Sequence, residues 1–137
     1  MSDMSGADVI RGFLGVSPLV QHLGLRLVGL EPDRATIVLP FTPQVVTVGD
    51  VVHGGAISAL VDTTAMAASW STPTLPAVPR GTTVSLTVDF VAAARAQDLT
   101  AEARVVRRGK NLNFCQVEVR DAGGQLVAIG LVTYKLG

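Results

Sequence analysis

One apolar stretch limits what this chain can fold into. Between residues 51 and 79 the only Asp, Glu, Lys or Arg is Asp62, and the part from Gly54 to Trp70 consists of small and apolar residues typical of a buried helix. An ionised carboxylate in such a segment is costly unless it is paired, hydrogen-bonded or partly hydrated. A carboxylate in apolar surroundings is also suited to general-base chemistry. Asp62 is therefore the first residue to consider for function.

The rest of the chain favours strands. Residues after 80 alternate in polarity and are rich in β-branched side chains, whereas the prolines between 73 and 79 exclude regular structure. The predicted elements are, in order, helical pieces at 7–14 and 18–23, strands at 25–30 and 35–40, an irregular or extended segment at 41–52, the helix at 54–70, and strands at 82–91, 99–107, 112–120 and 125–135.

This order predicts a single α+β domain over residues 1–137, in which an antiparallel sheet wraps around one long central helix and residues 1–16 form an N-terminal extension. The last strand is apolar on both of its faces. Leu126, Ala128, Gly130, Val132 and Tyr134 lie on one face, and Val127, Ile129 and Leu131 lie on the other. We expect one of these faces to meet the helix and the other to meet a partner chain, because monomers rarely expose such a face.

Composition narrows the class of protein. Eleven basic residues balance eleven acidic ones, so no basic surplus favours nucleic acid. Charged residues make up 16% of the chain, against an average of about 25%. A surface short of charge predicts burial in a homodimer or homotetramer. No apolar run reaches the roughly 20 residues of a membrane-spanning helix.

The N-terminus and the single cysteine predict a cytoplasmic protein. The first residues are acidic and lack the pattern of a secretory signal peptide. Cys115 is the only cysteine, which excludes an internal disulfide, and its position in a strand favours packing over reactivity. With only His22 and His53 beside it, a structural zinc site is not expected, and neither a metal nor a cofactor is predicted.

A turn at the start of the central helix has the features of an oxyanion site. His53-Gly54-Gly55 leads from an extended segment into the helix, where backbone N–H groups are free and the helix dipole favours negative charge. The glycines allow close approach of a ligand, and such a site suits the oxyanion of acyl transfer. Asp62 is too far along the helix to act on the same carbonyl. A two-fold dimer would bring it opposite Gly54 of the other chain.

His53-Gly54-Gly55 followed by Asp62 within Leu-Val-Asp-Thr, a proline-containing loop and four strands resembles the hotdog-fold acyl-CoA thioesterases of the PaaI-like, phenylacetic-acid-pathway type. The resemblance covers residues 19–136. It implies a hotdog fold and hydrolysis of an acyl-CoA to the free acid and CoA, with CoA as part of the substrate. Asp62 is then the general base or nucleophile. Gly54 polarises the carbonyl, His53 shapes the turn, and Thr83 helps to place the attacking water.

The resemblance also suggests residues that bind the substrate. Gly55 belongs to the carbonyl-binding turn, and Met66 and Trp70 are expected in the floor of the acyl pocket. Arg108 and Lys110, in the predicted hairpin at 108–111, are candidates for the CoA phosphates, although charges at a hairpin tip are more often simply solvated. The acyl group and the pathway do not follow from the sequence.

The chain departs from the family at Thr47. Relatives commonly carry Asn or Gln six residues before the His, and Thr is shorter and lacks the amide. This departure keeps open a non-catalytic module that binds acyl-CoA or lipid. A hotdog enoyl-CoA hydratase is a second alternative, but its expected Asp and His spacing is not found. Asp62 itself has a structural interpretation, in which it satisfies hydroxyl groups such as those of Ser58 and Thr63.

Overall fold

The computed structural model describes residues 4–137, and residues 1–3 of the predicted N-terminal extension lie outside the described residues. The elements in chain order are α1 (Gly6–Leu14), α2 (Pro18–Leu23), β1 (Arg26–Glu31), β2 (Arg34–Leu39), a 3-10 turn (Pro43–Val45), β3 (Val46–Val48), β4 (Val51–Val52), α3 (Gly54–Trp70), β5 (Gly81–Phe90), β6 (Leu99–Arg108), β7 (Leu112–Arg120) and β8 (Leu126–Leu136). The helices and long strands predicted from the sequence are confirmed, with ends that differ by at most one residue.

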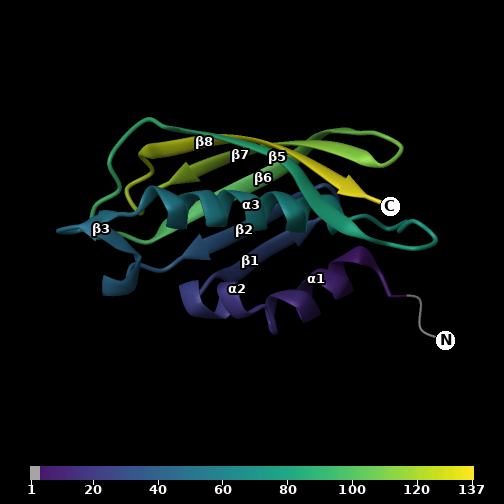
Figure 1. The fold of residues 1–137 in the computed structure, drawn as a ribbon, viewed down its shortest axis with the longest axis horizontal. Coiled ribbons are helices and arrows are strands. Elements are labelled where there is room, and N and C mark those ends of the chain that lie inside the picture. Colours follow the sequence, from purple (N-terminus) through teal and green to yellow (C-terminus); the bar gives the residue numbers. More distant parts are fainter. Residues whose placement is uncertain (1–3) are drawn as a thin grey trace.

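Six strands form one antiparallel sheet in the order β1-β2-β6-β7-β8-β5. The sheet curves around α3, which lies along its inner face (Figure 1). This confirms the predicted α+β class and the hotdog arrangement of a sheet around a central helix. None of the helices within residues 4–137 has the length and apolarity needed to cross a membrane. The strand β5 is an edge strand, since only β8 pairs with it.

The helix α3 packs closely on the sheet because its inward side chains are apolar and one facing strand residue is a glycine. Leu60 and Val61 are fully buried. A Cβ added at Gly130 of β8 would lie 2.5 Å from Cγ1 of Val61, so helix and strand approach as closely as a missing side chain allows. This contact fixes the position of the middle turn of α3, which carries Asp62.

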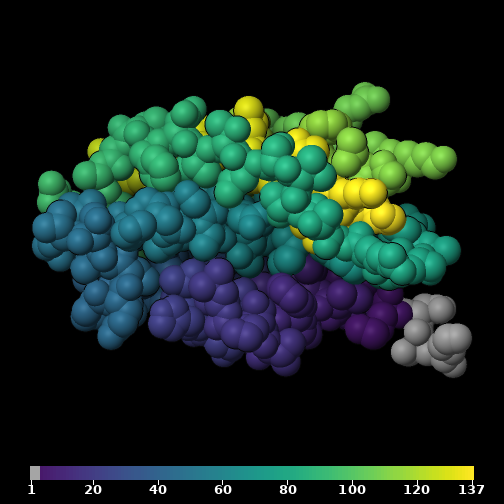
Figure 2. All heavy atoms as spheres, viewed as in Figure 1, coloured from purple at the N-terminus to yellow at the C-terminus, as the bar shows by residue number. Residues whose placement is uncertain are grey.

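The N-terminal helices close the other side of α3, and Figure 2 shows them packed directly against the central segment. A capping box between Ser5 and Asp8 starts α1. Ile10 is buried in the same core as α3. A Cβ at Gly6 would lie 1.6 Å from the carbonyl oxygen of Trp70, so α1 begins in direct contact with the end of α3.

The C-terminal end of α3 is anchored to the turn between β1 and β2. The N–H of Asp33 donates to the carbonyl of Ser71, and the Ser71 hydroxyl donates to the carbonyl of Glu31. Arg108 donates to the carbonyl of Ser69 and, through two nitrogens, to one carboxylate oxygen of Asp33. These bonds satisfy carbonyls that the end of a helix leaves without partners.

The segment 41–52, predicted as irregular or extended, contains a short hairpin in which β3 pairs with β4. In the last strand, Val132 and Tyr134 of one face are buried, as is Val127 of the other face. Leu131, on the same face as Val127, is 59% exposed.

Candidate active site

The carboxylate of Asp62 is held by a hydroxyl from the neighbouring strand. Thr83 Oγ1 donates a 2.6 Å hydrogen bond to Asp62 Oδ1. Both residues are half-buried. Thr83 pairs with Tyr134 on the sheet face that meets α3, which aims its hydroxyl at the helix. A hydroxyl that donates to a carboxylate fixes the direction of the carboxylate. Ser58, considered from the sequence as a partner of Asp62, donates instead to the carbonyl of Gly54.

The start of α3 leaves one N–H group available. His53 is the N-cap residue, and its Nδ1 accepts the N–H of Gly55 at 2.7 Å. The N–H groups of Ala56 and Ile57 donate to the carbonyl of His53. The N–H of Gly54 has no hydrogen-bond partner within residues 4–137. The positive end of the helix dipole is therefore presented through Gly54, while Gly55 is engaged by the cap.

Asp62 and Gly54 of one chain lie apart along the helix. Eight residues separate them, which corresponds to about 12 Å at 1.5 Å per residue. Gly54 instead neighbours the ring of Phe90 at the end of β5, which would lie 3.3 Å from an added Cβ. Phe90 is half exposed, at 51%. On a single chain, the N–H donor of Gly54 and the carboxylate of Asp62 are therefore too far apart to act on the same carbonyl group.

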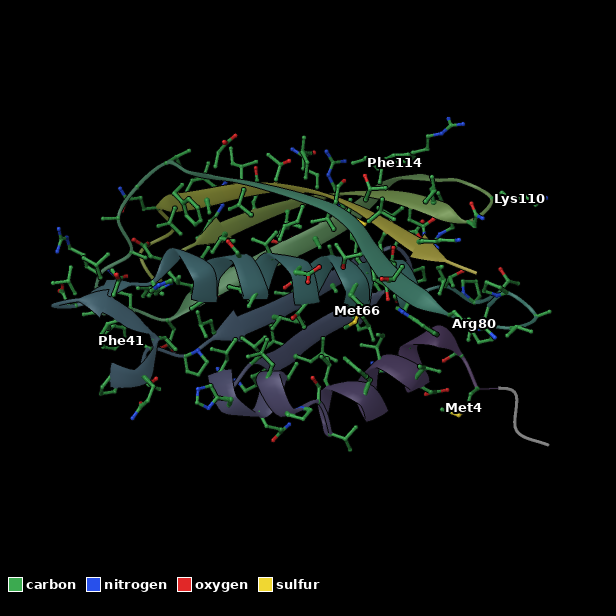
Figure 3. All side chains as sticks on the ribbon, in the orientation of Figure 1. Met4, Phe41, Met66, Arg80, Lys110 and Phe114 are labelled. Carbon is green, nitrogen blue, oxygen red and sulfur yellow. The ribbon has the colours of Figure 1, made fainter. Side chains whose placement is uncertain are left out.

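A cavity of about 170 Å³ lies at the other end of α3. Met66 and Trp70 line it from α3, one and two turns beyond Asp62, and Figure 3 shows Met66 directed toward α1. Trp70 Nε1 donates a 2.8 Å hydrogen bond to the hydroxyl of Tyr134. Burial raises the pKa of Tyr134 and the negative charge of Asp62 adds to this rise, while the Trp70 bond opposes it. The cavity and the carboxylate are therefore electrostatic neighbours.

Thr47, the position at which the chain departs from the family pattern, lies on the surface. Thr47 is exposed in β3, in the hairpin that precedes the His53 turn, and makes no side-chain hydrogen bond within the described residues. Asp50 pairs with Arg95 at 3.1 Å, and His53 supplies the cap of α3. Because this ion pair is exposed, it contributes little to stability.

The two predicted phosphate-binding side chains have different surroundings. Arg108 is largely engaged by Asp33 and by the end of α3. Lys110 is exposed at the turn between β6 and β7 and makes no hydrogen bond or ion pair within residues 4–137. It lies at the opposite end of the molecule from β3, as Figure 3 shows. Of the two cations, Lys110 alone is free to meet an anion.

The remaining reactive side chains are not placed for catalysis. Cys115 is buried, and burial raises the pKa of its thiol, so the reactive thiolate is disfavoured. His22 is exposed in the last turn of α2. In the part of the chain that the structure describes, no three His, Cys, Asp or Glu side chains come together as metal ligands.

Two residues near the site were not found from the sequence. Tyr134 was assigned to one face of the last strand, but alternation alone gives no sign of its bond to Trp70. Phe90 was part of a strand that resembles the family's, yet its contact with Gly54 depends on how β5 crosses the helix. Both contacts join residues more than 30 positions apart, which a local pattern does not reveal.

Comparison with known proteins gives a consistent family. A family model described as the thioesterase superfamily matches residues 49–128. A protein of Saccharolobus solfataricus, named as a candidate esterase, is 27% identical over 116 residues, which cover 85% of this chain and 81% of that protein. The crystal structure of AziG from S. sahachiroi is 34% identical, covers 88% of this chain and 96% of its own, and superposes with a TM-score of 0.78. The PaaI protein of the E. coli phenylacetic acid degradation operon shares the fold, with a TM-score of 0.83 at 20% identity, over 95% of this chain and 92% of that one.

Proposed function

Since the chain belongs to the thioesterase superfamily, whose general activity is thioester hydrolysis, we propose that it cleaves acyl-CoA thioesters into a carboxylic acid and free CoA. The observation that carries the proposal is the 2.6 Å hydrogen bond from Thr83 to Asp62. It holds a carboxylate in a defined direction, in a mostly apolar helix whose first N–H group is available. This pairs a base with an oxyanion donor, as acyl transfer requires.

In the proposed reaction Asp62 activates water. The carboxylate takes a proton from a water molecule whose oxygen bonds to the thioester carbon, and the carbonyl oxygen becomes an oxyanion that accepts the N–H of Gly54. The intermediate then breaks its carbon–sulfur bond, and the proton on Asp62 passes to the departing thiolate. Thr83 keeps Asp62 aligned, and its oxygen has lone pairs left to accept a bond from the water.

Direct attack by Asp62 on the thioester carbon is the alternative route. It forms a mixed anhydride and expels the thiolate, and water then cleaves the anhydride. Hydrolysis in ¹⁸O-labelled water over several turnovers tests the anhydride route by mass spectrometry of a peptide containing Asp62. Label in the Asp62 carboxylate supports an anhydride that water opens at the Asp62 carbon. Label only in the product acid contradicts that opening and fits water activation or an anhydride opened at the acyl carbon.

The complete site is proposed to form between two copies of the chain. The edge strand β5 has an unpaired side and exposes Leu86 and Phe90, at 38% and 51%. Natural proteins seldom leave a ten-residue edge of this kind open. Pairing of two such edges would extend the sheet across both chains and bring Gly54, beside Phe90, toward Asp62 of the partner subunit. This supports a dimer with two equivalent sites.

Binding of CoA is proposed to involve Lys110, whose ammonium group is free to meet a phosphate, with Arg108 in a lesser role because its guanidinium already bonds to Asp33. The matched test compares Lys110→Ala with Lys135→Ala, another exposed lysine. A rise in KM for Lys110→Ala alone supports the assignment, and equal KM values in both variants contradict it.

The activity is tested by incubating purified protein with acetyl-, hexanoyl-, dodecanoyl- and phenylacetyl-CoA and following free thiol. Catalytic release from at least one of them supports the hydrolase. Saturable binding without thiol release would favour a non-catalytic acyl-CoA module. A parallel assay with an enoyl-CoA, read by loss of the conjugated double bond without thiol release, would reveal the hydratase alternative.

A further inference from the structure

One wall of the cavity beside Met66 is formed by the N-terminal helix α1. Val9, Ile10 and Phe13 line it from α1, opposite Met66 and Trp70 of α3. Their spacing places them on one side of α1. Nothing in the resemblance drawn from the sequence used α1, which falls within the predicted N-terminal extension.

The position of this cavity relative to Asp62 follows from helix geometry. Asp62, Met66 and Trp70 are four residues apart in turn, so they lie on one face of α3 and successive members are about 6 Å apart along its axis. On the adjoining strand Thr83 bonds to Asp62, and Gly81, two residues earlier on the same face, lines the cavity. The cavity thus begins one turn beyond the carboxylate.

The far end of the cavity is closed by a fixed pair of side chains. Trp70 and Tyr134 are joined by their hydrogen bond, and a Cβ at Gly81 would lie 2.0 Å from the Tyr134 hydroxyl and 2.6 Å from Trp70 Nε1. Any larger residue at position 81 would displace this pair. Tyr134 is 4% exposed, so the end wall is part of the core and does not yield easily.

We propose that this cavity receives the tail of the acyl group and that α1 sets the length of tail accepted. The proposal rests on the proposed function, because it places the thioester at Asp62. A volume of about 170 Å³ compares with an apolar cavity of about 150 Å³ that binds benzene. The structure therefore assigns to this enzyme compact apolar tails, of the size of one six-membered ring or an unbranched chain of about six carbons.

Phe13 is the residue of α1 that limits the cavity toward solvent. Its side chain is 43% exposed while also lining the cavity, so it forms part of the wall rather than of the core. Shortening it should open the wall and admit longer tails. The neighbouring Gly12 is the matched control, because a Cβ there would meet nothing within 4 Å.

The test uses CoA thioethers with S-alkyl chains of two to twelve carbons, which cannot be hydrolysed, and the emission of Trp70, the only tryptophan in the chain. Each methylene that enters the cavity should tighten binding about fourfold, since burying one contributes about 0.8 kcal/mol. We expect this gain to stop near six carbons and Trp70 emission to respond to S-hexyl-CoA but not to CoA alone.

Three variants test whether α1 sets the chain length at which the gain in affinity stops. Phe13→Ala should move this break to longer chains, Val9→Phe should move it to shorter ones, and Gly12→Ala should leave it unchanged. Thermal unfolding checks that each variant folds. A gain that continues evenly to twelve carbons in the unaltered protein would overturn the proposal, as would a Phe13→Ala profile equal to that of Gly12→Ala. If the break is present but none of the four acyl-CoAs is hydrolysed, the hydrolase proposal fails and the cavity assignment stands.

Discussion

Thr83 Oγ1 lies 2.6 Å from Asp62 Oδ1 and donates a hydrogen bond to it, which joins the edge strand β5 to the middle of the central helix. This hydrogen bond explains how the single carboxylate of Asp62 is tolerated in an apolar helix. It also gives Asp62 a fixed direction, which a solvated carboxylate would lack. The proposed chemistry depends on this relationship, and the first prediction removes it.

Thr83→Val replaces the hydroxyl by a methyl group of similar shape and keeps the β-branched side chain suited to a strand. Hydrogen bonds to charged groups contribute about 1.5–3 kcal/mol, so kcat should fall about 10- to 100-fold. The measurement is steady-state thiol release. Thr83→Ser retains the hydroxyl and should keep most of the activity, and an equal loss in both variants would show that the hydroxyl is not what matters.

Gly54→Pro removes the available N–H with little change to the backbone. Proline is favoured at the first position of a helix, and His53, with φ −64° and ψ 133°, already has the conformation that precedes proline. Loss of an oxyanion donor should lower kcat about 100- to 1,000-fold. Gly54→Ala keeps the N–H and places its Cβ 3.3 Å from the Phe90 ring, so it should lose far less. Equal kcat values for the Pro and Ala variants would contradict the role of this group.

Mixing two inactive variants tests whether the site spans two subunits. In a dimer of Asp62→Asn with Gly54→Pro, one of the two sites combines an intact Asp62 with an intact Gly54, provided that they come from different chains. Denaturing and refolding an equal mixture should restore about a quarter of the unaltered activity, because half of the dimers are mixed and each has one site. No recovery, or a monomer by light scattering, would contradict a shared site.

The buried thiol and phenol predict how stability depends on pH. Burial raises the pKa of Cys115 and of Tyr134, so the unfolded chain releases these protons at lower pH than the folded one. Their contribution is complete at neutral pH and is lost as pH rises above about 8.5 for the thiol and about 10 for the phenol. The urea midpoint should therefore fall above pH 8.5. In Cys115→Ala this fall should begin only near pH 10, and an identical profile would refute the thiol's part.

The fold followed from the sequence because its signals are local. The small and apolar run from Gly54 to Trp70 and the alternation in the later strands each specify one element. The hairpin of β3 and β4 was missed because its strands have three and two residues, too few to show a period.

The site could be predicted only in part, because most of its contacts join distant positions. Asp62 stood out through its cost in an apolar helix, but its bond to Thr83 was not predicted, since the family resemblance gave Thr83 only a role in placing the attacking water. Arg108 looked like a free cation at a hairpin tip, and its partner Asp33 lies 75 positions earlier. No sequence pattern indicated that α1 forms a wall of the cavity, since Val9 and Phe13 are ordinary apolar residues of an amphipathic helix.

The most direct test of Asp62 as the catalytic carboxylate compares thiol release from hexanoyl-CoA by the unaltered protein and by Asp62→Asn. The substitution keeps the size of the side chain and can still accept the Thr83 hydrogen bond, so circular dichroism and thermal unfolding should show a folded protein. Removal of a general base predicts a kcat lower by about 100- to 10,000-fold. Equal rates in the two proteins, with both folded, would contradict the assignment of Asp62 as the catalytic carboxylate.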